Sequence, residues 1–173
     1  IIMPSYNTAP YIGETIQSVL NQTYQNWEII IMDDCSTDNT DEVVASIKDE
    51  RIKYFHNEKN SGAAVSRNRA LREAQGRWIA FLDSDDIWMP EKLEKQISFM
   101  ESNGYSFSYT NYEEIDVDGN STGVKVTGPN KVTKTGMFNY CWLGCLTVMY
   151  DAEKIGLIQI EDIKKNNDYA MWL

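Results

Sequence analysis

Trp78-Ile79-Ala80-Phe81-Leu82-Asp83-Ser84-Asp85-Asp86 joins a short apolar run to three carboxylates. The run has the length of a strand buried on both faces, so the turn after it carries negative charge from the core to one edge of a sheet. Such charge is costly unless water or a cation receives it. Oxygen ligands at this spacing suit a hard divalent ion, which can in turn hold a phosphate ester. The stretch therefore predicts a buried sheet with metal-assisted chemistry on a phosphorylated substrate at its edge.

Upstream of this turn, short apolar runs alternate with helical patterns. Residues 1–3, 27–32 and 52–55 predict three earlier strands. Helical spacing follows each strand, and the inward positions are Ile12, Ile16, Val19 and Leu20, then Val43, Val44 and Ile47, then Ala64, Ala70, Leu71 and Ala74, then Leu93, Ile97 and Met100. Gly76 is expected as the C′ residue of the third helix, and Pro90 in the first turn of the fourth. This order predicts an α/β fold with a doubly wound, mostly parallel central sheet and helices on both faces.

After Gly104 the pattern changes to an antiparallel one. Residues 105–115 alternate apolar and polar side chains, Asp118-Gly119 is a hairpin turn signal, and residues 124–126 form the expected return strand. Residues 127–146 are typical of a loop, residues 147–150 of a last strand, and residues 151–173 of mixed helix and turn. We therefore expect a small antiparallel hairpin region in the C-terminal half.

Length and composition favour one soluble domain over residues 1–173. Hydrophobic residues make up 42% of the chain and charged residues 24%, which is ordinary for a globular protein. The chain opens on an apolar run and closes on Met171-Trp172-Leu173, which resembles an unfinished helix. We expect a fragment of a longer protein, truncated at its C-terminus.

The net charge argues against nucleic acid as a partner. Lys and Arg number 16 against 26 Asp and Glu, so the formal charge is −10, and no basic patch offsets repulsion from phosphate. The cysteines Cys35, Cys141 and Cys145 lack a zinc-like repeat and suggest reduced thiols in a cytoplasmic protein. No apolar stretch approaches the roughly 20 residues that span a bilayer, and no signal peptide is visible. Association with the inner face of the membrane through missing segments stays open, as does the oligomeric state.

Polar side chains follow three of the predicted strands. They are Pro4-Ser5-Tyr6-Asn7, Asp33-Asp34 and Asp83-Ser84-Asp85. In open parallel α/β sheets, ligands bind beyond the carboxyl ends of the strands, so we expect these groups to meet at one edge. Capping of the next helix is the alternative for Asp33 and Asp34, and it suffices for Asp38.

Several other polar segments have simpler explanations than ligand binding. Asp116-Val117-Asp118-Gly119-Asn120 also pairs two carboxylates, but its hairpin turn explains each residue. Neither acidic segment is an EF-hand, because the sixth loop position is Trp88 or Ser121 instead of glycine. Small residues from Gly62 to Asn68 open a helix that favours anions. Arg67 is expected to pair with Asp83 or touch a nucleotide, whereas Arg69 and Arg72 are expected on a solvated helix face and the single histidine, His56, in a structural role.

Together these segments resemble a family 2 glycosyltransferase of the GT-A fold. The resemblance runs through residues 1–90 without a gap and loosens beyond Pro90. It is carried by Ile2-Met3-Pro4-Ser5-Tyr6-Asn7, Ser18-Val19-Leu20-Asn21-Gln22-Thr23-Tyr24, residues 28–38, residues 62–68 and residues 80–86. It implies an inverting enzyme that moves a sugar from a nucleotide-diphosphate sugar, a UDP-sugar in the family's commonest case, to an acceptor hydroxyl in polysaccharide or glycoconjugate biosynthesis.

The resemblance also implies roles for individual residues. Pro4 and Tyr6, with Asn7 nearby, would line the pocket for the base and ribose, and Asp34 would hydrogen-bond the base. Arg67 would lie over the nucleotide, and Ser84 belongs to the same donor-binding turn. Asp83 would contact the ribose or a metal-bound water, and Asp85 would coordinate Mn²⁺ or Mg²⁺ on the diphosphate. Residues 1–103 would bind the nucleotide sugar, and residues 104–173 would hold the acceptor and the catalytic base.

Asp168 is the base that the resemblance implies. The family's base usually ends an acidic pair before an aromatic and apolar run, and Asn167-Asp168-Tyr169-Ala170-Met171-Trp172-Leu173 matches that context. Asn167 stands where glutamate is usual, and Glu161-Asp162 is a competing pair with a poorer context. Tyr140 and Trp142 either stack on an acceptor sugar or pack in the interior.

Other classes of protein fit less well. A dinucleotide-binding oxidoreductase needs a glycine-rich turn after the first strand, where Pro4-Ser5-Tyr6-Asn7 stands instead. A sugar-phosphate nucleotidyltransferase usually has a basic, glycine-rich loop there. An acidic edge also suits a metal-dependent phosphatase, and a non-catalytic nucleotide-sugar-binding module is the alternative from a different class.

Overall fold

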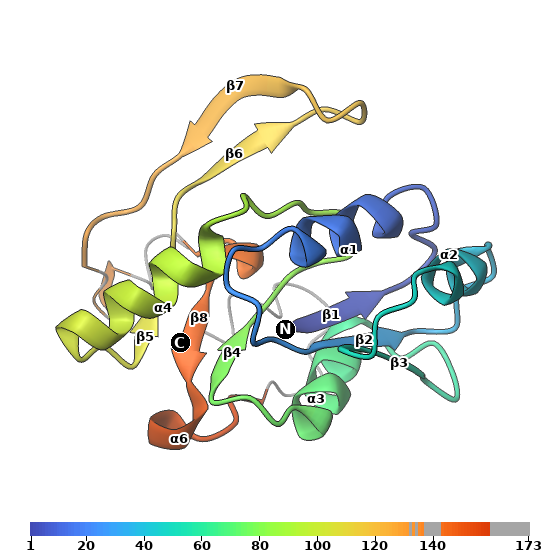
Figure 1. Ribbon diagram of the computed structural model, residues 1–173, viewed down its shortest axis with the longest axis horizontal. Helices are drawn as coiled ribbons and strands as arrows, with labels where there is room; N and C mark the ends of the chain where they lie inside the picture. The colour runs from blue at the N-terminus through green and yellow to red at the C-terminus, as the bar shows by residue number, and fades with distance from the viewer. Residues whose placement is uncertain (132, 134, 137–142, 160–173) are drawn as a thin grey trace.

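The computed structural model describes residues 1–131, 133, 135–136 and 143–159 (Figure 1). The strands are β1 (Ile2–Ser5), β2 (Ile29–Asp33), β3 (Ile52–His56), β4 (Trp78–Ala80), β5 (Phe107–Ser108), β6 (Tyr112–Ile115), β7 (Ser121–Val126) and β8 (Met149–Asp151). The helices are α1 (Ile12–Leu20), α2 (Thr40–Ser46), α3 (Ala63–Glu73), α4 (Lys92–Asn103) and α6 (Ala152–Ile155), with a 3₁₀ turn, η1, at Cys145–Thr147. In the described part of the chain, no helix is long and apolar enough to cross a membrane.

The central strands run mostly parallel, as expected. β1 pairs with β2, and β2 with β3, in parallel register. β4 joins the other side of β1 through a parallel bridge between Ile2 and Phe81, where the Leu82 amide donates to the Ile2 carbonyl at 3.0 Å. β8 then pairs antiparallel with both β4 and β5. The carboxyl ends of β1 to β4 therefore lie at one edge of the sheet.

Two apolar layers cover the two faces of this sheet. Met3 and Ile31 point to the layer that contains the buried side chains of α1 and α4. Their neighbours Ile2 and Ile30 point to the other layer, which contains the buried side chains of α3. Successive side chains of a strand alternate between faces, so the continuous apolar runs of β1 and β2 fill both layers. Helices on both faces are thus confirmed.

The ends of two helices differ from the sequence predictions. α3 ends at Glu73, Ala74 is extended, and Gly76 is not in the left-handed conformation of a C′ residue. The Glu28 carboxylate accepts hydrogen bonds from the Gln75 and Gly76 amides, at 2.6 and 3.2 Å, and these bonds hold the chain extended after α3. Pro90 lies in the turn before α4, which begins at Lys92.

The antiparallel hairpin is present and stands away from the body of the molecule (Figure 1). β6 and β7 pair from Tyr112 with Val126, and the Asp116 carboxylate accepts from the Asp118 and Asn120 amides, each at 2.9 Å. Turn chemistry therefore explains this second acidic segment, as predicted. The expected single strand over residues 105–115 is divided into β5 and β6.

Candidate functional site

The site predicted from the strand ends lies at the carboxyl edge of the parallel strands. Ser5 at the end of β1 lies opposite Asp33 at the end of β2, and the Asp34 amide donates to the Ser5 carbonyl at 2.8 Å. Asp83 follows β4, which lies on the other side of β1. The topology therefore collects the three polar segments along one edge.

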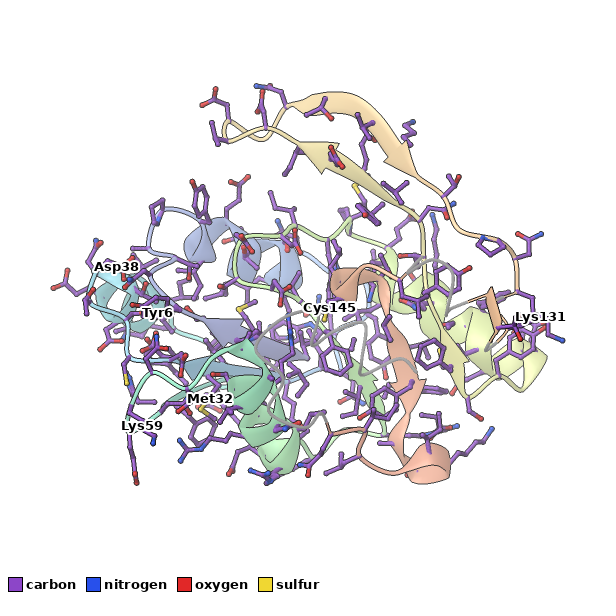
Figure 2. The ribbon with its side chains drawn as sticks, turned by 180° about the vertical axis from the view of Figure 1, so that it is seen from behind. Tyr6, Met32, Asp38, Lys59, Lys131 and Cys145 are labelled. Atoms are coloured by element: carbon purple, nitrogen blue, oxygen red, sulfur yellow. The ribbon has the colours of Figure 1, made fainter. Side chains whose placement is uncertain are left out.

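The segment after β1 presents Tyr6 to solvent. Pro4 is buried, whereas Tyr6 is 50% exposed and lies near the turn that carries Asp38 (Figure 2). Asn7 adopts a left-handed backbone conformation, with φ of 54°, and its side-chain oxygen accepts from the Thr37 amide at 2.7 Å. Asn7 thus holds the turn after β2, and the aromatic ring of Tyr6 is exposed beside that turn.

Asp34 anchors the loop that leads into α3. Its carboxylate is almost fully buried and accepts from Asn57 Nδ2 at 2.6 Å, the Ser61 amide at 2.8 Å and the Gly62 amide at 2.7 Å. A carboxylate has about four lone-pair sites, so these three bonds leave room for one more donor. Asp34 therefore shapes this part of the edge by holding β3 and the start of α3 to β2.

Asn57 is a site residue that the sequence analysis missed. It is buried, and it donates to Asp34 and to Ser66 Oγ while accepting from Arg69 Nη1 at 2.8 Å. Arg69 is therefore bound at the site and is not a purely solvated side chain. The signal was present, because Asn57 directly follows β3, just as the predicted residues follow their strands.

Arg67 makes the ion pair that the sequence predicted. Its side chain is 6% exposed, and Nη2 lies 2.7 Å from Asp83 Oδ1. α3 thus carries a buried cation to the acidic turn after β4, while the residue that precedes the helix, Gly62, is held to Asp34. The helix connects the two acidic strand ends.

The acidic turn presents Asp85 to solvent. Ser84 is buried, Asp85 is exposed, and Asp83 is partly occupied by Arg67. Burial, together with the neighbouring charges of Asp83 and Asp85, raises the pKa of Asp86 to about 7. Negative charge therefore exceeds what the turn can neutralise by itself, which is a condition that a bound cation relieves.

The donor set of this turn suits a divalent ion shared with a substrate. Mg²⁺ is typically held by one or two carboxylates together with substrate phosphates and water. Asp85 has both oxygens open, and Asp83 keeps one oxygen beyond Arg67, so this chain would supply one or two ligands. Phosphate oxygens would complete the coordination.

A second group of possible metal ligands lies beside this edge. Among the described residues, the side chains that bring three candidate ligand atoms within 4.8 Å of one another are Asp33, Asp41 and His56. Asp33 already accepts from the Ser36 amide at 2.8 Å, and His56 Nδ1 lies 3.7 Å from Asp33 and 3.9 Å from Asp41. Hydrogen bonds to residues outside the group, from Ser36 to Asp33 and from Tyr54 to Asp41, already account for the positions of the two carboxylates.

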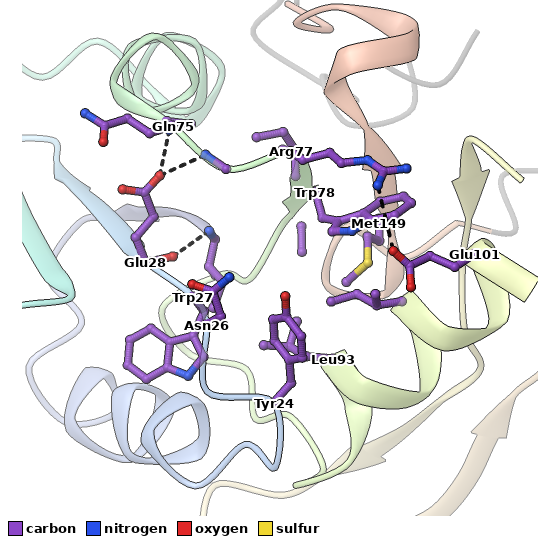
Figure 3. A pocket seen from close by; sticks show the side chains of 16 residues that line it. Tyr24, Asn26, Trp27, Glu28, Gln75, Arg77, Trp78, Leu93, Glu101 and Met149 are labelled. Carbon is purple, nitrogen blue, oxygen red and sulfur yellow. Dashed lines mark hydrogen bonds and ion pairs between the residues drawn. The ribbon is translucent and has the colours of Figure 1, made fainter.

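A cavity of about 590 Å³ lies at the opposite, amino edge of the parallel strands (Figure 3). Its walls come from the start of β2, the segment between α3 and β4, and α4; they include Tyr24, Trp27, Gln75, Trp78 and Leu93. None of the predicted site residues lines it. The cavity is therefore not the site that the strand ends predict.

Several predicted residues lie outside the described residues. They are Asp168 with its neighbour Asn167, the competing pair Glu161-Asp162, and the aromatic residues Tyr140 and Trp142.

Comparison with known proteins identifies the family. The model of the family named Glycosyl transferase family 2 matches residues 1–145. The chain is 46% identical to the putative teichuronic acid biosynthesis glycosyltransferase TuaG of Bacillus subtilis, covering 100% of this chain and 69% of TuaG. It is 49% identical to the UDP-Glc:alpha-D-GlcNAc-diphosphoundecaprenol beta-1,3-glucosyltransferase WfgD of Escherichia coli, covering 100% of this chain and 67% of WfgD.

The fold is shared with solved glycosyltransferase structures. The S. aureus TarS 1–349 structure in complex with UDP superposes with a TM-score of 0.79 at 25% identity, covering 98% of this chain and 52% of the TarS chain. The chain thus spans about two thirds of these curated relatives and about half of that solved structure. Strand-end chemistry, topology and similarity agree: this chain has the GT-A fold and belongs to glycosyl transferase family 2.

Proposed function

We propose that this protein is an inverting glycosyltransferase that transfers a sugar from a UDP-sugar to an acceptor hydroxyl in bacterial polysaccharide or glycoconjugate biosynthesis. The observation that carries the proposal is the acidic turn at the carboxyl edge, where Arg67 holds Asp83 and Asp85 stays open. The relatives support the donor class, because WfgD is named for UDP-Glc and TarS was solved with UDP.

The donor would lie along the edge from Tyr6 to Asp85. Tyr6 would supply an exposed aromatic ring, Pro4 lies buried in β1, and Asp34, whose carboxylate already accepts three hydrogen bonds, would accept one more from the base. Asn7 would not contact the donor itself but would hold the turn after β2 in place. The diphosphate would then reach the turn at Ser84, beside the ion pair of Asp83 with Arg67 of α3.

Asp85, with Asp83, would hold Mn²⁺ or Mg²⁺ against the diphosphate. When bound, the ion supplies positive charge where the leaving nucleoside diphosphate gains negative charge. Arg67 orients Asp83 through the 2.7 Å ion pair and adds a further positive charge beside the turn. The chain's own contribution is therefore to fix two carboxylates and one guanidinium around the diphosphate.

Proton removal from the acceptor is assigned to Asp168. An acceptor hydroxyl attacks the anomeric carbon on the face opposite the leaving diphosphate, and the carboxylate takes its proton, so a single displacement inverts the anomeric centre. General base catalysis of this kind contributes on the order of 10²–10⁴-fold. In this proposal residues 1–103 bind the donor, and residues 104–173 supply the base and the acceptor contacts.

The setting follows from the acceptor chemistry of the relatives. WfgD is named for a diphosphoundecaprenol-linked acceptor, and TuaG for teichuronic acid biosynthesis. We propose a saccharide or lipid-linked acceptor for this protein, with action in the cytoplasm or at the inner face of the membrane.

Calorimetry with UDP tests the donor and metal assignments. We expect Asp85→Asn to raise the Kd of UDP in the presence of Mn²⁺ by at least about tenfold, which equals ~1.4 kcal/mol, and to leave the metal-free Kd unchanged. Asp118→Asn is the matched control, because it removes one carboxylate from the exposed hairpin turn. Equal effects of the two variants would remove Asp85 from the metal site.

The base assignment is tested by Asp168→Asn. We expect this variant to bind UDP and Mn²⁺ as the original protein does and to lose transfer from a panel of UDP-sugars to saccharide and lipid-linked acceptors. Full transfer by Asp168→Asn would reassign the base, with Glu161-Asp162 as the next pair to substitute. If the original protein binds UDP-sugars but transfers no sugar with any combination of donor and acceptor, a nucleotide-sugar-binding module would be favoured.

A further inference from the structure

A stripe of buried polar side chains runs along α1 and just past its end. Thr15 is 1% exposed, Ser18 is 7% exposed, and Gln22 is 1% exposed. Their spacing of three and four residues places them on one side of the helix, next to the apolar positions Ile16 and Val19. Polar groups are costly to bury unless each finds a partner, so the partners of this stripe show what it is for.

All three side chains bind backbone groups of the segment that contains the acidic turn. Thr15 Oγ1 donates to the Ser84 carbonyl at 3.1 Å, and the Trp88 amide donates to Ser18 Oγ at 3.2 Å. Gln22 binds at two points: Nε2 donates to the Met89 carbonyl at 2.8 Å, and Oε1 accepts from the Leu93 amide at 3.0 Å. We call Thr15, Ser18 and Gln22 the α1 clasp.

The clasp holds a segment that has little regular structure of its own. Between Phe81 and the start of α4, the chain forms two short turns. The Asp86 amide donates to the Asp83 carbonyl at 3.1 Å in the first, and the Lys92 amide donates to the Met89 carbonyl at 3.0 Å in the second. Three carboxylates within the first turn repel one another, which favours spreading of the backbone. The clasp fixes the backbone on both sides of Asp85 without any bond to its carboxylate.

The same segment is also tied to the second half of the chain. Trp88 is held at its amide by Ser18, and its indole Nε1 donates to the Leu146 carbonyl at 2.9 Å. Trp88 is therefore held both to α1, through Ser18, and to η1, through Leu146.

We propose that the α1 clasp is a positioning device that holds the acidic turn in the geometry that binds a divalent ion and diphosphate, while touching neither ligand. This inference rests on the proposed function, because it takes Asp83 and Asp85 as the metal and diphosphate site. Groups that are preorganised before the ligand arrives spare the binding energy otherwise spent on ordering them.

Thr15→Val tests the clasp, because valine has a methyl group of similar size in place of the hydroxyl of threonine and cannot form the hydrogen bond. We expect it to weaken Mn²⁺ binding to the UDP complex by about threefold to tenfold, the effect of one lost hydrogen bond, and Gln22→Met to weaken it at least as much. Thr15→Ser keeps the hydroxyl, so its affinity for Mn²⁺ should stay within about twofold of that of the original protein. Mn²⁺ binding is measured by electron paramagnetic resonance of the free ion, without any assay of transfer.

Val19→Ala is the matched control for loss of stability. Val19 is fully buried on α1 and belongs to the core, but it makes no hydrogen bond to the segment. Both variants are expected to lower the Tm, and Mn²⁺ binding is compared at a temperature at which both are fully folded. Only Thr15→Val should then weaken Mn²⁺ binding. Equal weakening by both, or equal weakening by Thr15→Ser and Thr15→Val, would overturn the positioning role.

Hydrogen exchange separates this inference from the proposed function. In the metal-free protein, Thr15→Val should accelerate exchange of the amides of residues 84–93 more than those of β1 and β2, whereas Val19→Ala should show no such preference. If the original protein fails to bind UDP and Mn²⁺, the proposed function is wrong, and selective exchange still shows whether the clasp fixes the turn. Without selective exchange the clasp does not position the turn, whatever the protein binds.

Discussion

At the scale of single residues, Asp86 is the group whose charge depends most on the fold of the acidic turn. Burial, with Asp83 and Asp85 beside it, raises its pKa to about 7 from an ordinary value near 3.8. A raised carboxyl pKa means that the folded state binds the proton more tightly, so ionisation of Asp86 destabilises the fold as pH rises from about 4 to about 7. Asp86→Asn should therefore gain stability over the original protein at pH 8 and gain little near pH 4.5. Urea unfolding at both pH values, with Asp118→Asn as control, measures this; an equal difference at the two values would contradict it.

Single residues also show how far the sequence predicts the site. The pairing of Arg67 with Asp83 followed from one residue at a helix start and another at a strand end. Asn57 was missed, because one amide after a strand does not stand out until the fold brings it to Asp34. Asn7 was expected near the ligand, yet its side chain binds the Thr37 amide, a contact between residues 30 positions apart. Contacts between distant segments are what the sequence leaves open.

At the scale of elements, the start of α3 depends on the backbone of Gly62. Its φ is 86°, which is unfavourable for side chains, and its amide donates to Asp34 at 2.7 Å. We expect Gly62→Ala to cost about 1–2 kcal/mol in unfolding free energy and to weaken UDP binding. Gly13→Ala is the control of opposite sign: Gly13 lies inside α1 without a positive φ, and a Cβ there meets Val43 at an ordinary 3.4 Å, so a gain of up to about 1 kcal/mol is expected. Urea denaturation measures both; no loss in Gly62→Ala would show that the loop adapts.

Element type was easier to predict than element ends and partners. Apolar runs and helical spacing identified β1 to β4 and α1 to α4, because each pattern is local and strongly periodic. The predicted end of α3 was wrong because the Glu28 carboxylate, 47 residues before Gln75 in the chain, accepts hydrogen bonds from the Gln75 and Gly76 amides. The insertion of β8 between β4 and β5 could not be predicted, because a three-residue strand carries no signal for its partners.

At the scale of the whole molecule, β8 makes the two expected halves share one sheet. Residues 1–103 end with α4, yet β4 pairs along its outer side with β8, which comes from the second half. Buried Gln96 of α4 donates to Ser108 Oγ and to the Thr147 carbonyl, each at 3.0 Å, and both partners belong to the second half. Tyr150 of β8, fully buried, packs in the same layer as Phe81. A donor-binding half and an acceptor half would therefore be functional regions of one folding unit.

We therefore predict that residues 1–103 alone do not fold cooperatively. Without β8 the outer edge of β4 has no partner, the Gln96 amide is left without its acceptors, and the apolar layer behind Phe81 loses Tyr150. We expect the fragment to show a broad, weakly cooperative urea transition and to aggregate, whereas residues 1–159 unfold in one sharp transition. Circular dichroism and scanning calorimetry of the two chains measure this. A sharp transition of the shorter chain, together with UDP binding, would instead make the first half a domain that binds the donor by itself.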